Sequence, residues 1–145
     1  MSGLEHWAAG RLRVHVVDAD ADRRGRLCRL LRAARLDCRA FTGGRAALRA
    51  MSGAGQGAAA PSVLVAMLTG ERHWLREARA RSPGLVIIGL TPLIRVQDAG
   101  HFAPLRNLLN VDYVLPAPVD GAELMAALVL AAADLPSADR LTRAS

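Results

Sequence analysis

Three aspartates stand at alternate positions directly after an apolar segment near the start of the chain. The apolar segment is Val14 to Val17, and the carboxylates are those of Asp18, Asp20 and Asp22. Carboxylates in this setting can ligate a divalent cation, or they can accept hydrogen bonds from the free N–H groups at the start of a helix. We expect loop and capping roles for them, with Asp20 or Asp22 as the N-cap of a following helix.

The other side chains that could do chemistry form no arrangement with a recognised spacing. The histidines lack metal-ligand spacing; they are His6, His15, His73 and His101. The glycine-rich segment 53–57 precedes a strand and lacks the Lys-Ser/Thr of a phosphate-binding loop. Ser62, Ser82 and Cys28 give no nucleophile arrangement. We therefore expect no enzymatic activity and no cofactor, and we expect His15 to be a packed or edge residue.

Composition indicates one globular domain with an arginine-rich surface. The chain has 145 residues, 52% of them hydrophobic and only 3% aromatic, with a net charge of +6. All 19 basic residues are arginines, so the chain contains no lysine. No signal peptide is evident in the first ten residues, and no apolar run approaches the roughly 20 residues of a spanning helix. We expect a cytoplasmic protein in which Cys28 and Cys38 are reduced thiols.

The hydrophobic pattern predicts short strands that alternate with helices. The expected strands are Arg13–Val17, Asp37–Phe41, Ser62–Met67, Leu85–Leu90 and Val111–Leu115. The expected helices are one from about Asp22 to Ala34, then Ala46–Met51, Glu71–Arg81, one that ends near Asn110, and Gly121–Ala133. Alternation of this kind predicts an α/β fold with a doubly wound parallel sheet and helices on both faces. The functional residues of such folds lie at the carboxyl ends of the strands.

Residues at those strand ends resemble the receiver (CheY-like) domains of bacterial two-component response regulators. The resemblance rests on the segment from Val16 to Arg23, on Thr91 after the Ile87–Leu90 run, and on Asp112 to Leu115 followed by Pro118 to Asp120. It covers roughly Arg11 to Ala133. It implies a flavodoxin-like five-stranded sheet of order 2-1-3-4-5, in a domain spanning residues 11–134 with tails at 1–10 and 135–145. It also implies that Thr91 and Tyr113 are switch-like residues.

The resemblance fails at the residues that perform the chemistry of the family. Receivers hold Mg²⁺ with two acidic residues after the first strand and an aspartate that ends the third strand, and that aspartate accepts a phosphoryl group. Here Asp18 is the vestige of the metal site, Ala19 replaces the second acidic residue, and Ala66 occupies the phosphoacceptor position. The lysine that contacts the phosphate is replaced by Ala117, or by Pro116 in another alignment. The sequence therefore resembles an atypical pseudo-receiver that has lost phosphorylation.

The first helix carries a row of arginines that could bind a partner. Its candidate contact residues are Arg23, Arg26, Arg29 and Arg32. A solvated helix face is the simpler interpretation, and guanidinium groups would also suit an acidic protein partner. No interleaved aromatic residues or known motif favour nucleic acid, so that alternative rests on charge alone.

These observations predict a bacterial, phosphorylation-independent receiver-like regulatory domain that acts through protein contacts, with a homodimer as one form of contact. No contact with a membrane is expected. Two alternatives stay open. One is a regulator that contacts nucleic acid through its arginine surface, and the other is a small-molecule sensor that uses the vacant crevice at the strand ends.

Overall fold

The computed structural model describes residues 12–53, 61–69, 72–92 and 111–134. A parallel sheet forms its centre, with the strands β1 (Arg13–Val17), β2 (Asp37–Phe41), β3 (Val63–Met67), β4 (Val86–Thr91) and β5 (Tyr113–Pro116). The strand order is β2-β1-β3-β4-β5, and every neighbouring pair is parallel. The predicted fold class and the predicted strand order 2-1-3-4-5 are confirmed.

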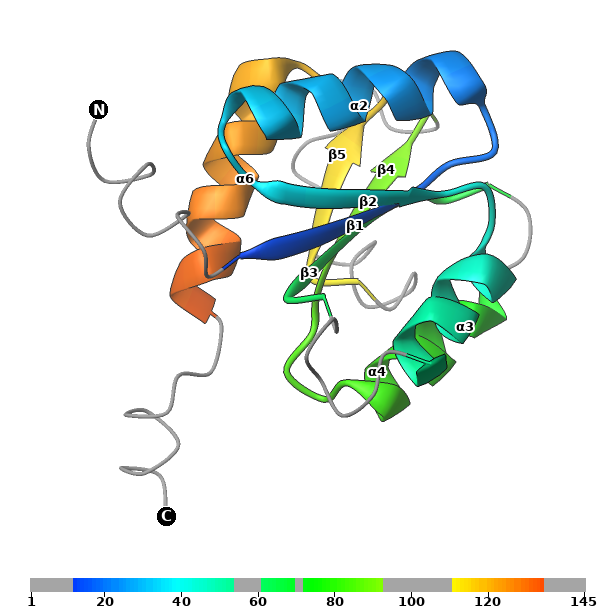
Figure 1. The fold of residues 1–145 in the computed structure, drawn as a ribbon. Helices are drawn as coiled ribbons and strands as arrows, with labels where there is room; N and C mark the ends of the chain where they lie inside the picture. Colours follow the sequence, from blue (N-terminus) through cyan, green and yellow to red (C-terminus); the bar gives the residue numbers. More distant parts are fainter. Residues whose placement is uncertain (1–11, 54–60, 70–71, 93–110, 135–145) are drawn as a thin grey trace.

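Four helices of the described ranges cover the two faces of this sheet (Figure 1). They are α2 (Ala21–Ala33), α3 (Gly44–Gly53), α4 (His73–Arg81) and α6 (Gly121–Asp134). The apolar side chains of α2 and α6 pack on one face, and those of α3 and α4 pack on the other. Successive strand residues alternate between the two faces, so Val65 contributes to the α2–α6 core and Leu64 to the α3–α4 core. The central strand β3 is buried on both faces, as its continuous apolar sequence predicts.

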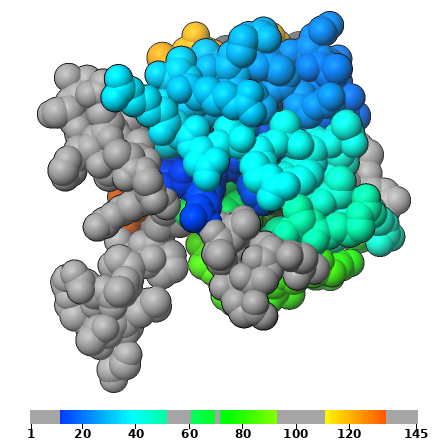
Figure 2. Space-filling model, viewed as in Figure 1, coloured from blue at the N-terminus to red at the C-terminus, as the bar shows by residue number. Residues whose placement is uncertain are grey.

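The edge strand β2 is the exception to this burial. It lies between α2 and α3 (Figure 2), and Asp37, Arg39 and Ala40 are exposed while Cys38 is buried. An edge strand leaves hydrogen-bonding groups unpaired, and charged side chains along it oppose pairing with another chain. Asp37 and Arg39 supply such charges here.

Helix α2 has well-defined hydrogen bonds at both ends. Asp20 is the N-cap, because its carboxylate accepts the N–H of Arg23 at 2.9 Å. At the other end Arg35 takes the left-handed conformation (φ 65°), and the N–H of Leu36 donates to the carbonyl of Leu31 at 3.0 Å. This bond from Leu36 back to the fifth residue before it is typical of a helix C-terminus. The chain then continues into β2.

Several element boundaries differ from those expected from the sequence. Helix α3 is longer at both ends than Ala46–Met51, and α4 begins at His73. Strand β5 begins at Tyr113. The preceding Asp112 lies against Ile87, to whose carbonyl it donates its N–H at 2.9 Å and from whose N–H its carboxylate accepts at 2.8 Å. The helix expected to end near Asn110 lies outside the described residues.

Candidate functional site

The candidate site lies where β1, β3 and β4 end on the same side of the sheet. Asp18 follows β1, Met67 is the last residue of β3, and Thr91 is the last residue of β4. Parallel strands bring such residues together although they are far apart in the sequence. Neighbouring residues in the ladder confirm the alignment, since Val17 pairs with Ala66 and Met67 with Leu90.

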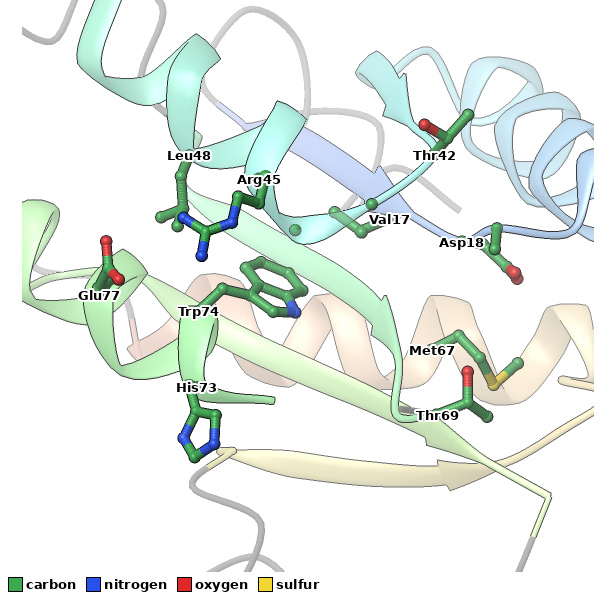
Figure 3. Close-up of a pocket in the computed structure, with 13 residues that line it drawn as sticks. Val17, Asp18, Thr42, Arg45, Leu48, Met67, Thr69, His73, Trp74 and Glu77 are labelled. Atoms are coloured by element: carbon green, nitrogen blue, oxygen red, sulfur yellow. The ribbon is translucent and has the colours of Figure 1, made fainter. Parts of the chain in front are cut away.

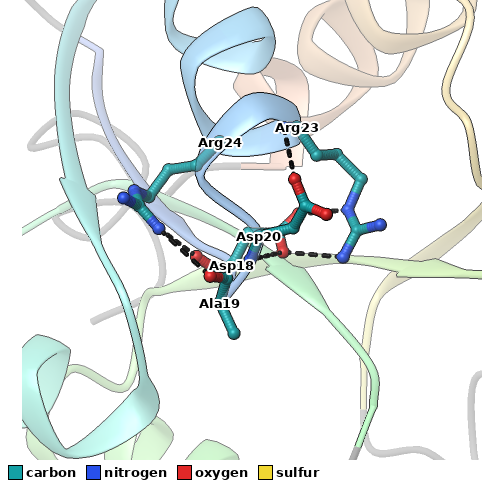
Figure 4. A network of polar contacts seen from close by, with 5 residues as sticks. All are labelled: Asp18, Ala19, Asp20, Arg23 and Arg24. Atoms are coloured by element: carbon teal, nitrogen blue, oxygen red, sulfur yellow. Dashed lines mark hydrogen bonds and ion pairs between the residues drawn. The ribbon is translucent and has the colours of Figure 1, made fainter.

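Asp18 is held by Arg23, which lies in the first turn of α2. Its side chain is fully buried, and both of its carboxylate oxygens accept hydrogen bonds from Arg23, Oδ2 from Nε at 2.5 Å and Oδ1 from Nη2 at 2.8 Å (Figure 4). The N–H of Asp20 donates to the same Oδ1 at 2.9 Å. This contact with Asp18 raises the pKa of Arg23 above its usual range. The carboxylate therefore has a cationic partner from its own chain.

The adjacent arginine fixes the backbone of the same loop. Arg24 donates from Nη1 to the carbonyl oxygen of Asp18 at 2.8 Å (Figure 4). The two consecutive arginines thus bind the side chain and the main chain of one aspartate. A loop held in this way has little freedom to rearrange around a ligand.

The end of β3 presents a thioether where a carboxylate nucleophile would be needed. Met67 and Asp18 line the same cavity (Figure 3). Ala66 lies on the opposite face of the sheet, in the core formed with α3 and α4. At the strand end next to Asp18, the structure therefore places Met67 and not the predicted Ala66. Neither residue can accept a phosphoryl group.

The other positions to which the resemblance pointed also lack charged side chains. Ala19 is exposed and brings no second carboxylate beside Asp18. Ala117 is half-buried against the α2–α6 core, and its N–H donates to the carbonyl of Thr91 at 3.0 Å. Within the described ranges no cluster of three or more histidine, cysteine or acidic residues could hold a metal ion.

The two residues expected to be switch-like lie on different faces of the sheet. Thr91 is buried and follows Leu90, which belongs to the α2–α6 core, so its side chain is directed to the α3–α4 side. Tyr113 pairs with Ile88 and packs against the α2–α6 core. The structure does not bring these two side chains together. Val114, next in the sequence, is the β5 residue on the face of Thr91.

The arginine surface of α2 is smaller than predicted. Arg23 was a candidate partner-binding residue, but it is bound to Asp18, and only 33% of its side chain is exposed. Arg26, Arg29 and Arg32 are exposed on α2. The spacing of Asp18 and Arg23, two residues before and three residues after the N-cap Asp20, was the sequence signal for this ion pair.

The buried polar residues near the site do not extend it. His15 is 2% exposed and its ring packs against Phe41 at 5.0 Å, as a packed residue would. Burial lowers the pKa of His15 to about 4. Cys28 and Cys38 are buried free thiols whose sulfur atoms lie 3.2 Å apart.

A cavity lies at the strand ends beside Asp18, where the sequence left open a vacant crevice, but its lining residues from α3 and α4 were not predicted. It has a volume of about 210 Å³, and Arg45, His73 and Trp74 are among its lining residues (Figure 3). Gly43 and Gly44 were interpreted only as a turn. The pair of glycines before an arginine at the start of a helix was the available signal, since it leaves space at a helix N-terminus.

Comparison with known proteins identifies the fold through structure alone. No protein-family model matches the chain, and no curated protein sequence matches it either. A pilus assembly-related protein from Burkholderia pseudomallei has a similar structure (TM-score 0.68, 22% identity, 87% of this chain and 92% of that chain). A chemotaxis protein from Vibrio cholerae is also similar (TM-score 0.66, 16% identity, 83% of this chain and 98% of that chain). So is a CheY-like receiver domain protein from Methanospirillum hungatei (TM-score 0.65, 13% identity, 81% of this chain and 90% of that chain).

The chain therefore has the CheY-like fold of response-regulator receiver domains. At these identities the likeness concerns the fold and not the activity. No helix in the described ranges is both long enough and apolar enough to cross a membrane.

Proposed function

We propose that this chain is a receiver-like module of bacterial signal transduction that works through protein contacts and without phosphorylation or any catalysis of its own. The observation that carries the proposal is the bidentate contact between Arg23 and the buried carboxylate of Asp18. In this arrangement the guanidinium supplies the positive charge that a metal ion would otherwise bring to that carboxylate. The state of the module would then depend on what binds it.

The chemistry of phosphoryl transfer supports this proposal. Mg²⁺ is held in proteins by carboxylates together with phosphate oxygens and water. Ala19 and Met67 offer no further carboxylate, and the sequence has no lysine to stabilise a transferred phosphoryl group. Transfer to an aspartate requires a carboxylate nucleophile, and Asp18 has both oxygens bonded to Arg23.

An amide NMR titration with Mg²⁺ followed by beryllofluoride tests this proposal, because beryllofluoride imitates an aspartyl phosphate. We expect no shift at Asp18, Asp20 or Thr91. Saturable shifts at these residues with both reagents would overturn the proposal. As a positive control we suggest a chain with Ala19→Asp, Met67→Asp, Ala117→Lys and Arg23→Ala, checked for folding, which should gain a Mg²⁺ response.

Exposed apolar side chains on α6 support protein contact through this helix. Among the described residues the exposed large hydrophobic side chains are Val129 (41%) and Leu130 (56%), both on this helix. Ala126 and Ala133 are exposed near them. Interface centres are poor in charge, and a symmetric dimer places the same patch of both copies in contact. We propose a second copy of this chain as the partner of this face.

Analytical ultracentrifugation tests the dimer. We expect concentration-dependent association that Leu130→Glu abolishes, whereas Arg76→Glu on the exposed side of α4 leaves it unchanged. A monomer at all concentrations would overturn the dimer proposal.

The cellular setting belongs to the same proposal. A pilus assembly-related protein is among the similar structures, which supports a role in organising a larger assembly. A cytoplasmic location, where signalling receivers operate, fits a module of this kind. Fractionation of the native cell, followed by recovery of its bound proteins, tests both expectations.

A further inference from the structure

A cavity at the carboxyl ends of β1 and β3 has no role in the function proposed above. Its volume is about 210 Å³, and its walls come from the loop before α3, from the first turns of α3 and α4, and from Thr69 after β3 (Figure 3). A water molecule takes up roughly 30 Å³ in the liquid, so the space corresponds to about seven waters. The cavity is therefore large enough for a small metabolite and too small for a peptide segment.

The charges around this cavity leave one cation without a partner. Of its two lining carboxylates, Asp18 is bound by Arg23 and Glu77 lies 3.3 Å from Arg81. Arg45 is exposed and makes no hydrogen bond or ion pair with any other residue in the described ranges. It lies in the first turn of α3, which contains no acidic residue and where the helix dipole adds partial positive charge.

The indole of Trp74 gives the cavity a flat apolar wall. Figure 3 shows this ring between the side chains of Arg45 and His73. Gly44 allows the ring to lie there, because a Cβ atom on Gly44 would come within 2.2 Å of Cγ of Trp74. The half-buried ring keeps part of its surface open to the cavity.

We propose that this cavity binds a small organic monoanion, an aromatic carboxylate, with its carboxylate on Arg45 and its ring against Trp74. A single guanidinium matches the two oxygens of one carboxylate, whereas a phosphate dianion would call for further cations that the lining lacks. The hydroxyl groups of Thr42 and Thr69 add neutral donors at the rim. Binding would stiffen the contact between α3 and α4.

Fluorescence of Trp74 tests the proposal directly. The chain has two tryptophans, so Trp7→Phe leaves Trp74 as the sole reporter. Benzoate, phenylacetate and nicotinate are the probes, with benzamide as the uncharged analogue of benzoate. We expect a saturable change in emission with at least one carboxylate and an affinity at least tenfold weaker for benzamide.

Variants on α3 separate the cavity from general charge effects. Arg45→Gln should weaken binding of the carboxylate at least tenfold, while Arg49→Gln, which removes an exposed arginine of the same helix outside the cavity, should leave it unchanged. Circular dichroism checks that each variant is folded. The absence of saturation with all three carboxylates, or equal binding by Arg45→Gln, would overturn the proposal, and neither result bears on phosphorylation independence.

Discussion

The Nε and Nη2 atoms of Arg23 lie 2.5 and 2.8 Å from the two carboxylate oxygens of Asp18. The carboxylate is fully buried, whereas a third of the arginine side chain is exposed. A buried carboxylate without a cation is strongly unfavourable. This pair therefore joins the end of β1 to the start of α2 and gives the buried carboxylate a cationic partner.

Loss of Arg23 should destabilise the fold. We expect Arg23→Ala to lower the free energy of unfolding by about 2 kcal/mol, because the buried Asp18 would lose its partner while solvent reaches one side of the site. Urea unfolding followed by circular dichroism measures this loss. Arg26→Ala, at an exposed position of the same helix, should change stability by less than about 0.5 kcal/mol. Equal stabilities for the two variants would contradict the structural role of the pair.

The buried histidine should make stability depend on pH. Burial, with a smaller contribution from Arg39, lowers the pKa of His15 from 6.5 to about 4, although Asp37 opposes the shift. The unfolded chain therefore binds this proton at a higher pH than the folded chain, and stability falls as the pH drops from 6.5 towards 4. The loss attributable to His15 is at most about 3 kcal/mol.

A matched pair of variants isolates this contribution from the carboxylates that titrate nearby. His15→Leu should flatten the stability profile between pH 6.5 and 4, whereas His73→Gln, at an exposed position, should leave it unchanged. Urea midpoints measured across this range provide the comparison. A profile that keeps its full slope in His15→Leu would show that other groups cause it.

The two buried thiols should be unreactive until the chain unfolds. Burial raises the pKa of Cys38 to about 12, so only about one part in 10⁴ of it is thiolate at pH 8. We expect 5,5′-dithiobis(2-nitrobenzoate) to label the native protein far more slowly than free glutathione, and labelling in urea to be fast. Rapid labelling of Cys38→Ser, which retains only Cys28, would show instead that Cys28 is accessible.

Two adjacent glycines should respond differently to the same substitution. Gly44→Ala places a methyl group within 2.2 Å of the Trp74 ring, and we expect a loss of about 1 to 3 kcal/mol. The methyl group added by Gly43→Ala has no atom within 4 Å, so this variant should lose much less stability. Thermal melts of both variants make the comparison. Replacing Trp74 by Leu in the Gly44→Ala chain should restore part of the loss.

The left-handed residue after α2 offers a stabilising change. Arg35 has a φ of 65°, a conformation that glycine adopts without strain. Arg35→Gly should raise the free energy of unfolding by about 1 kcal/mol, whereas Arg32→Gly, inside the helix, should lower it by about 1 kcal/mol. Chemical unfolding of both variants decides the point, and a loss of stability in Arg35→Gly would contradict the assigned end of the helix.

Sequence periodicity was sufficient for the architecture but not for the element ends. The apolar runs of β3 and β4 and the stripe of α2 are local signals, and these three elements lie within about a residue of their predicted bounds. The start of β5 was placed too early: Asp112 precedes the strand, and its carboxylate accepts the N–H of Ile87 and forms an ion pair with Arg79. Such contacts join residues that are distant in the chain, so hydrophobic periodicity cannot predict them.

The sequence by itself determined the fold and the absence of particular side chains. The chain has Ala19 after its first strand, no lysine and no carboxylate at the end of its third strand, and these absences were the basis for expecting no phosphoryl transfer. The order of strands and helices likewise follows from hydrophobic patterning, because parallel strands need crossover helices.

Only the tertiary structure decided what the remaining residues do. Arg23 was equally compatible with a docking surface and with an internal ion pair until the end of β1 was placed beside α2. The cavity between Arg45 and Trp74 exists because α3 and α4 lie together with Gly44 at their contact. Both depend on distances between elements, which the packing of side chains on the sheet sets and local sequence does not.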